Sequence, residues 1–184
     1  MIAASLSRLD PRAATLAGVV GFAAAVGLAA QVALPIPGTP VPITLQPMLV
    51  VLAGLWLGPA PAAASMALYL TAGALGLPVF TPFGAPGAAR LLGPTGGYLL
   101  AYPVAAYATA WLSRRGTRSY ARDALSAVLG MLVLYAGGLA QLTALSGSVE
   151  RAAVLGLIPF VTLDVVKAHV AALLAPRRAG RAGA

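Results

Sequence analysis

Long apolar stretches, interrupted by short clusters of proline, glycine and arginine, dominate the chain. Between Arg12 and Arg90 there are 77 residues without a formally charged side chain. A helix needs about 20 apolar residues to cross the hydrocarbon core of a bilayer. The sequence lacks the alternating segments of about ten residues that are typical of membrane barrels. The pattern therefore predicts several membrane-spanning helices.

Proline and glycine mark the ends of six predicted spans. The spans cover residues 13–34, 44–57, 60–77, 96–112, 123–145 and 152–175. Proline is favoured in the first turn of a helix, so we expect the final helix to start near Pro159 and to end at Ala175. The segment 78–95 is rich in proline and glycine and is expected to be a loop. We therefore expect an all-α membrane protein, a six-transmembrane-helix bundle that forms a single domain over residues 1–184.

The composition excludes several other classes of protein. Hydrophobic residues make up 60% of the chain and charged residues 9%, against about 45–50% and about 25% in soluble domains. The chain has no cysteine and a single histidine, His169, so one chain cannot build a thiolate or multi-histidine metal site. The motifs of P-loop nucleotide binding, serine hydrolysis and zinc proteolysis are missing from the sequence. We expect no enzymatic activity, no metal and no cofactor.

The positions of the basic residues predict the orientation in the membrane. With six spans, Arg8 and Arg12 fall on the same side as the basic groups at 114–122 and 177–181, and this side holds 9 of the 12 basic residues. Cytoplasmic segments carry an excess of Lys and Arg, so we expect cytoplasmic termini with basic tails at about 1–12 and 176–184. The net charge of +8 then follows from topology, and we expect no nucleic-acid partner.

Asp164 and Lys167 differ from the other charged residues because they lie inside an apolar stretch. Three residues apart on a helix, they share a face, and charges at membrane depth usually face each other or a cavity. A neutralising pair that holds the helix in the bundle and a pair that lines a polar pocket are both compatible with the sequence. Arg90, in an outer loop, can be solvated or bind a ligand. His169 is about 200° from Lys167 on the helix and is expected to face away.

Two further patterns have an ordinary and a functional interpretation. Gly21, Ala25 and Ala29 form a stripe of small residues spaced by four, which permits close helix–helix approach in lipid. The chain is rich in alanine, so chance and a docking face both explain the stripe. Glu150 and Arg151 are adjacent in a predicted outer turn and are expected to be solvated.

Four motifs together resemble one known family. The run from Leu34 to Gln46, LPIPGTPVPITLQ, is similar to the signature of the BioY family, the biotin-binding S components of energy-coupling-factor (ECF) vitamin transporters. The other matching segments are GALGLPVF at 73–80, LGPTGGY at 92–98, and Pro159-Phe160 followed by Asp164-x-x-Lys167. Their order and spacing between about residue 30 and residue 175 are similar to those of the family.

The resemblance implies the S-component fold in the cell membrane of a prokaryote, with a biotin pocket that opens to the outside. By motif position, Arg90, Asp164 and Lys167 are the polar groups expected to hold biotin. A carboxylate such as Asp164 can accept a ureido N–H, and Arg90 or Lys167 can bind the carboxylate of the ligand through a charge-assisted bond. The sequence leaves open which of the two cations does so. Further contacts are expected from Thr44, Gln46, Phe80, Tyr98 and Phe160.

The mechanism that the resemblance implies is capture without chemistry. An S component binds the vitamin outside, docks on a transmembrane coupling (T) protein driven by two ABC-type ATPases, and releases the vitamin inside. Gly21, Ala25 and Ala29 lie where S components carry their docking face. The alternatives are an S component or solitary transporter for another small anionic vitamin, an intramembrane acyl or prenyl transferase that uses Asp164 and Lys167, and a structural subunit without a ligand.

Overall fold

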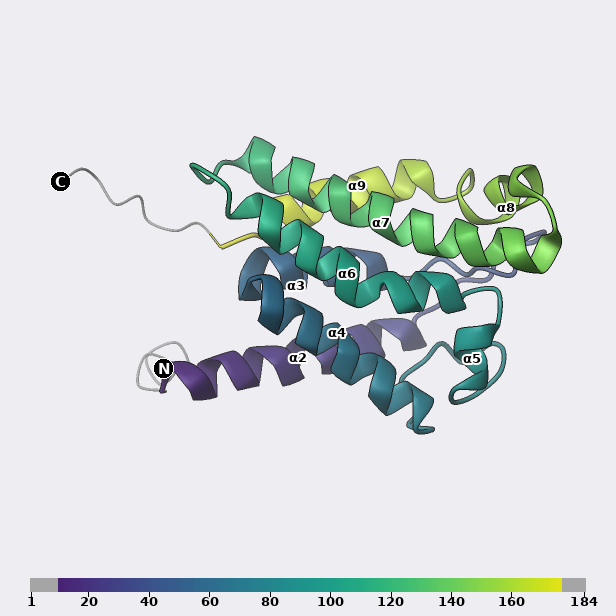
Figure 1. The fold of residues 1–184 in the computed structure, drawn as a ribbon, viewed down its shortest axis with the longest axis horizontal. Helices are drawn as coiled ribbons and strands as arrows, with labels where there is room; N and C mark the ends of the chain where they lie inside the picture. Colours follow the sequence, from purple (N-terminus) through teal and green to yellow (C-terminus); the bar gives the residue numbers. More distant parts are fainter. Residues whose placement is uncertain (1–9, 177–184) are drawn as a thin grey trace.

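The computed structural model describes residues 10–176, which form helices and the connections between them. In chain order the helices are α2 (Pro11–Gln31), α3 (Gln46–Leu57), α4 (Pro59–Ala74), α5 (Ala89–Leu92), α6 (Gly96–Ser113), α7 (Tyr120–Ser146), α8 (Val149–Gly156) and α9 (Val161–Leu173). Figure 1 shows that α2 begins and α9 ends at the same end of the bundle. Each of the first five predicted spans coincides with one helix, and their ends differ by only a few residues.

The last predicted span consists of two helices rather than one. Helices α8 and α9 are bent by 55° relative to each other, and Pro159 lies in the connection between them. Proline lacks the backbone N–H that a continuous helix needs, which explains the break. The final helix begins at Val161 and ends at Leu173, each within two residues of the predicted bounds near Pro159 and at Ala175. Glu150 and Arg151 lie on α8 rather than in a turn, and both are exposed.

Helix length alone does not define six membrane spans. Among residues 10–176, α2 and α7 are long and apolar enough to cross a membrane, and the bent pair α8 and α9 makes a third span if it is counted as one. Helix α3 has 12 residues and α4 has 16, fewer than the roughly 20 that a straight span requires.

Helix α3 lies at the centre of the bundle and packs against α2, α4, α6, α7 and α9. Val50, Val51 and Ala53 on this helix are completely buried, as is Met66 on the neighbouring α4. A helix that is apolar on all sides is typical of a core position. This packing holds α6, α7 and α9, the three helices that contribute to the site described below.

Small residues allow α6 and α7 to pack closely. A Cβ atom on Gly97 would lie 2.2 Å from the carbonyl oxygen of Gly137, and one on Gly138 would lie 2.1 Å from ring atoms of Tyr98. Close approach through glycine is typical of helices packed in a membrane. Tyr98 therefore fits into a slot on α7 that exists because Gly138 has no side chain.

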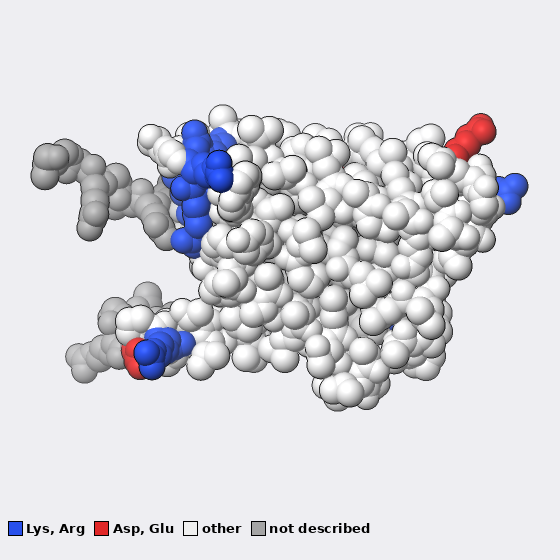
Figure 2. All heavy atoms as spheres, in the orientation of Figure 1, with Lys and Arg blue, Asp and Glu red and all other residues white. Residues whose placement is uncertain are grey.

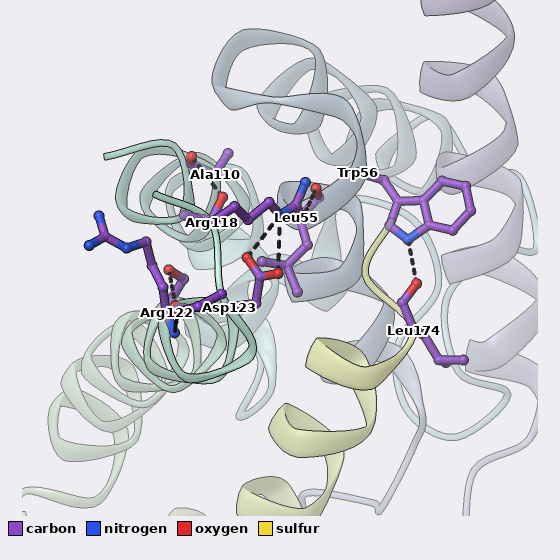
Figure 3. Close-up of polar contacts among 10 residues, drawn as sticks. Leu55, Trp56, Ala110, Arg118, Arg122, Asp123 and Leu174 are labelled. Carbon is purple, nitrogen blue, oxygen red and sulfur yellow. Dashed lines mark hydrogen bonds and ion pairs between the residues drawn. The ribbon is translucent and has the colours of Figure 1, made fainter. Parts of the chain in front are cut away.

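Basic side chains gather at the end of the bundle where α2 begins and α6 passes into α7, here called the basic end (Figure 2). Arg118 Nε lies 3.1 Å from both carboxylate oxygens of Asp123, and Arg118 Nη2 donates to the Leu55 carbonyl at 2.8 Å (Figure 3). Trp56 Nε1 donates to the Leu174 carbonyl at 3.1 Å. These bonds tie the end of α3 to the start of α7 and to the end of α9. The other predicted members of the basic groups, Arg8, Arg177, Arg178 and Arg181, lie outside the described residues.

The segment between α2 and α3 is an ordered cap. Leu34 and Ile43 exchange two backbone hydrogen bonds of 2.9 Å, which form an isolated antiparallel bridge. Gly38, at the turn, has a φ of 86°, a conformation that favours glycine. Thr39 Oγ1 donates to the Leu155 carbonyl of α8 at 2.5 Å. The cap is therefore fastened at its base and at its tip.

The small-residue stripe of α2 lies beside the buried face of that helix. The buried face consists of Ala23, Val26, Gly27 and Ala30. Gly21 is exposed, Ala25 and Ala29 are half-buried, and a Cβ atom on Gly21 would meet nothing within 4 Å. Within residues 10–176 the stripe is thus open at Gly21 and partly covered at Ala25 and Ala29.

Candidate ligand-binding site

A cavity of about 70 Å³ lies between the cap, the first half of α6, the middle of α7 and the start of α9. This volume is several times what one ordered water needs. Much of the wall is apolar, with Leu99, Met131, Leu134 and Phe160 among its residues. The polar side chains of the wall are Thr44, Thr95, Tyr98, Tyr102, Tyr135, Asp164 and Lys167. Apolar walls with a few polar groups are typical of small-molecule sites.

Asp164 and Lys167 form an ion pair that also faces this cavity. Lys167 Nζ donates to Asp164 Oδ1 at 2.8 Å. Both residues are buried, with Lys167 5% exposed and Asp164 7% exposed. Asp164 lies in the first turn of α9, where the helix dipole stabilises a negative charge. The predicted shared face is confirmed. The charges are neutralised within α9 and the two residues border a cavity, but the ion pair itself does not link α9 to another helix.

The pair retains hydrogen-bonding capacity toward the cavity. Tyr135 donates to Asp164 Oδ2 at 2.6 Å, so each carboxylate oxygen of Asp164 receives one hydrogen bond. Each oxygen can accept another, and the Lys167 ammonium group has two N–H groups besides the one bonded to Asp164. This end of the cavity can therefore accept an N–H from a ligand and donate to a carbonyl oxygen.

Tyr135 was not predicted from the sequence as a site residue, although a signal for it exists. It lies near the middle of the predicted span 123–145, whereas tyrosine is usually found at membrane interfaces. A hydroxyl group at that depth needs a partner inside the protein. Tyr102 and Thr95 were also missed, and no comparable signal distinguishes them from the other tyrosines and threonines of the chain.

Arg90 does not line this cavity but lies next to it. The short helix α5 carries Arg90, and the side chain borders a second cavity of about 250 Å³, whose wall includes Pro40 and Phe83. Thr95 belongs to the walls of both cavities. The two predicted cationic groups are thus on neighbouring sides of Thr95, with Lys167 in the central cavity and Arg90 in the second.

The Arg90 guanidinium group is buried without a negative partner. It is 7% exposed and donates to the carbonyls of Ala85, Phe83 and Thr81 and to the Thr81 hydroxyl. These four bonds leave one of its five N–H groups without a hydrogen bond. No acidic group of residues 10–176 lies within ion-pair distance of Arg90. Burial lowers the pKa of Arg90 from its ordinary value, as expected for a cation removed from water. The surroundings therefore favour an anionic ligand group.

Thr44 and Tyr98 lie in the wall of the central cavity, as predicted. Tyr98 donates to the Gly156 carbonyl at 2.7 Å, and Thr44 Oγ1 donates to Gln46 Oε1 at 3.4 Å. Gln46 itself is buried behind the wall, where its Nε2 donates to the Tyr69 hydroxyl at 2.7 Å. Gln46 therefore supports the wall and does not line it.

The two predicted phenylalanines have different positions. Phe160 lines the central cavity. Phe80 is absent from its wall and packs edge-on against Tyr69, with ring centroids 5.5 Å apart. His169 faces away from the cavity, as predicted, and is exposed beside Tyr120 of α7. Residues 10–176 hold no cluster of three or more His, Cys, Asp and Glu side chains that suits a metal ion.

Helices, buried charges and a mostly apolar cavity together define a helical membrane protein with an internal site for a small, partly polar molecule. Residues 4–183 match the model of the BioY family, and the chain belongs to this family. Two relatives show how similar the sequences are. A "Probable biotin transporter BioY" of Pyrococcus horikoshii is 42% identical over 86% of this chain and 92% of its own length. A "Biotin transporter BioY" of Thermotoga maritima is 39% identical over 77% and 83%.

A solved structure has the same fold. It is the S-component for biotin from an ECF-type ABC transporter, with a TM-score of 0.82, and the match covers 91% of this chain and 92% of the other. At 24% sequence identity, the likeness establishes the S-component fold. Membership of a family of transporters also places the chain outside the enzymes.

Proposed function

We propose that the protein is the biotin-binding S component of an ECF transporter. It captures biotin from outside the cell and releases it inside after docking on a T protein that two ABC-type ATPases drive. The family and the named relatives support this function, and the S-component fold supports the mode of action. The chain itself carries no nucleotide-binding motif, so the energy has to come from partner chains.

The observation that carries the proposal is the charge of the site. Asp164 and Lys167 neutralise each other across 2.8 Å, which leaves the buried Arg90 as the uncompensated charge of the two cavities. A net charge of +1 matches a ligand with a single carboxylate, and burial strengthens such an interaction. Biotin has one carboxylate at the end of its tail and a neutral ureido ring at the other end.

This charge distribution also assigns the two ends of the ligand. The ureido ring lies in the central cavity, where Asp164 accepts one of its N–H groups. The tail passes Thr95 and ends at Arg90, which binds the carboxylate through its remaining N–H group and its charge. Arg90 is the better partner because Lys167 is already neutralised. Thr44, Tyr98 and Phe160 enclose the ring in the cavity wall, and Gln46 positions Thr44 from behind.

The topology in the membrane is part of the proposal. The chain forms one multi-pass domain of six spans in the cell membrane of a prokaryote, with both termini in the cytoplasm. The gathering of basic side chains at one end (Figure 2) supports this orientation because cytoplasmic segments carry an excess of Lys and Arg. The cavities lie at the opposite end and therefore open to the outside. Gly21, Ala25 and Ala29, exposed or half-buried on α2, form the face that docks on the T protein.

Isothermal titration of the purified protein with biotin and a panel of other vitamins tests the function. We expect saturable 1:1 binding of biotin, and binding at least about tenfold weaker for biotin amide, whose tail is neutral. The Arg90→Met variant should bind the acid and the amide with similar affinity, because the charge that distinguishes them is gone. Tight binding of another anionic vitamin, without binding of biotin, would favour the alternative S component and contradict biotin as the ligand.

A further inference from the structure

The hydroxyl group of Tyr102 has no partner in the described part of the chain. Three tyrosines line the central cavity. Tyr98 donates to the Gly156 carbonyl and Tyr135 donates to Asp164. Tyr102 is 4% exposed, yet none of the hydrogen bonds formed within residues 10–176 involves its hydroxyl. Buried polar groups of proteins almost always have a partner, so a partner from outside the chain is expected.

The Tyr102 hydroxyl also reaches open space. Among residues 10–176, Ser65 Oγ is the fully buried side-chain nitrogen or oxygen atom that lacks a hydrogen bond. The Tyr102 hydroxyl also lacks a hydrogen bond but is not fully buried, so it is accessible. The open space that Tyr102 borders is the central cavity. A hydroxyl group in this position can donate to a ligand atom and accept from one.

The ring of Tyr102 is held rigidly from behind. It stacks on Tyr69 with ring centroids 6.0 Å apart and 21° between the planes. Tyr69 in turn packs against Phe80 and accepts a hydrogen bond from Gln46. Two of the predicted site residues, Gln46 and Phe80, thus support Tyr102 rather than touch the cavity. A ring fixed in this way presents its hydroxyl group in one direction, which favours specific recognition.

We infer that Tyr102 is a specificity-determining residue whose hydroxyl donates a hydrogen bond to the carbonyl oxygen of a cyclic urea, the ureido oxygen of the ligand. This inference rests on the proposed function. Tyr102 borders the cavity of Asp164 and Lys167 and is absent from the wall of the Arg90 cavity, so it serves the ring and not the tail. Asp164 accepts the N–H of the ureido group, and the oxygen of that group needs donors, which Tyr102 and Lys167 supply.

The test compares Tyr102→Phe with Tyr107→Phe in the purified full-length protein. Phenylalanine keeps the stack on Tyr69 and removes only the oxygen atom. Tyr107 lies five residues further along α6 and is 47% exposed, so its variant is a matched control. Isothermal titration should show about tenfold weaker binding of biotin by Tyr102→Phe and affinity within twofold of the parent for Tyr107→Phe. Equal thermal unfolding midpoints will show that both variants are folded.

Ligand analogues separate recognition from a general effect on the cavity. The difference between Tyr102→Phe and the parent should fall below about threefold for 2-thiobiotin, whose sulfur atom is a weaker acceptor than oxygen. It should persist for biotin amide, which is changed only at the tail. A full difference with 2-thiobiotin, or affinity of Tyr102→Phe for biotin within twofold of the parent, would overturn the inference. Failure of the parent protein itself to bind biotin would instead overturn the proposed function, and the inference with it.

Discussion

Lys167 and Asp164 combine two roles that the sequence presents as alternatives. Their 2.8 Å ion pair neutralises two charges inside an apolar bundle, and the same two side chains border the central cavity. A buried ion pair is often no more stable than an apolar pair of similar size. The retention of this pair in a cavity wall is therefore better explained by ligand binding than by stability.

We predict that Asp164→Asn and Lys167→Met each weaken biotin binding by at least about tenfold. Each variant also leaves one charged group buried without its partner, which can destabilise the fold by about 3–5 kcal/mol. Titration calorimetry and thermal unfolding should therefore be measured together. Glu150→Gln, which changes an exposed acid on α8, should leave both quantities unchanged. Parent-like binding by both cavity variants would show that the ligand lies elsewhere.

Single residues could be predicted from the sequence where their chemistry is unusual for its surroundings. Asp164 and Lys167 stand out because charge is rare within an apolar stretch. Tyr102 does not stand out, because a buried tyrosine and an interfacial tyrosine have the same local pattern. The positions of Gln46 and Phe80 behind the wall depend on their contacts with Tyr69, which the sequence does not reveal.

At the level of elements, the positions of proline and glycine predict where helices end. They do not predict which elements contact one another. The sequence predicts the break near Pro159, but not the separate helix α8, whose capping residue is Ser148. It also predicts a connection at 35–43, but not the cap, because the bridge between Leu34 and Ile43 and the bond from Thr39 to α8 depend on partners distant in the chain.

The slot for Tyr98 provides a prediction for helix packing. Gly138→Ala places a Cβ atom where the Tyr98 ring lies, so α6 and α7 must separate or the ring must leave its position. Overpacking of this kind destabilises a fold by about 1–3 kcal/mol, and we expect the thermal unfolding midpoint to fall by roughly 2–4 °C per kcal/mol. Gly21→Ala, where the added atom meets nothing within 4 Å, is the control. An unchanged midpoint for Gly138→Ala would mean that the slot is not tightly packed.

For the whole molecule, the sequence predicts the separation of charge along the bundle but not the shape of the site. The basic end follows from counting spans between arginine clusters. The adjacency of the two cavities does not, because Arg90 and Asp164 come from distant segments. The packing of α5 on α6, and of both α6 and α9 on α3 and α7, brings these segments together. The stripe on α2 is available to a partner because the buried face of that helix is formed by other residues.

Ala25→Trp should impair biotin uptake in cells that contain the coupling module, by at least about fivefold, and leave biotin binding to the purified protein within twofold of the parent. The large ring would prevent close approach of a helix to the stripe. Leu16→Trp is the matched control, since Leu16 is 64% exposed and lies about 180° from Ala25 around the helix. Normal uptake by Ala25→Trp would exclude this stripe as the docking face.

An experimental map of the protein with bound biotin tests the central claim most directly. The account predicts one elongated ligand that passes Thr95, with its ureido ring against Asp164 and Lys167 and its carboxylate within hydrogen-bond distance of Arg90. Ligand density in another part of the molecule, or a carboxylate bound by Lys167 with Arg90 still bonded only to its own loop, would contradict it.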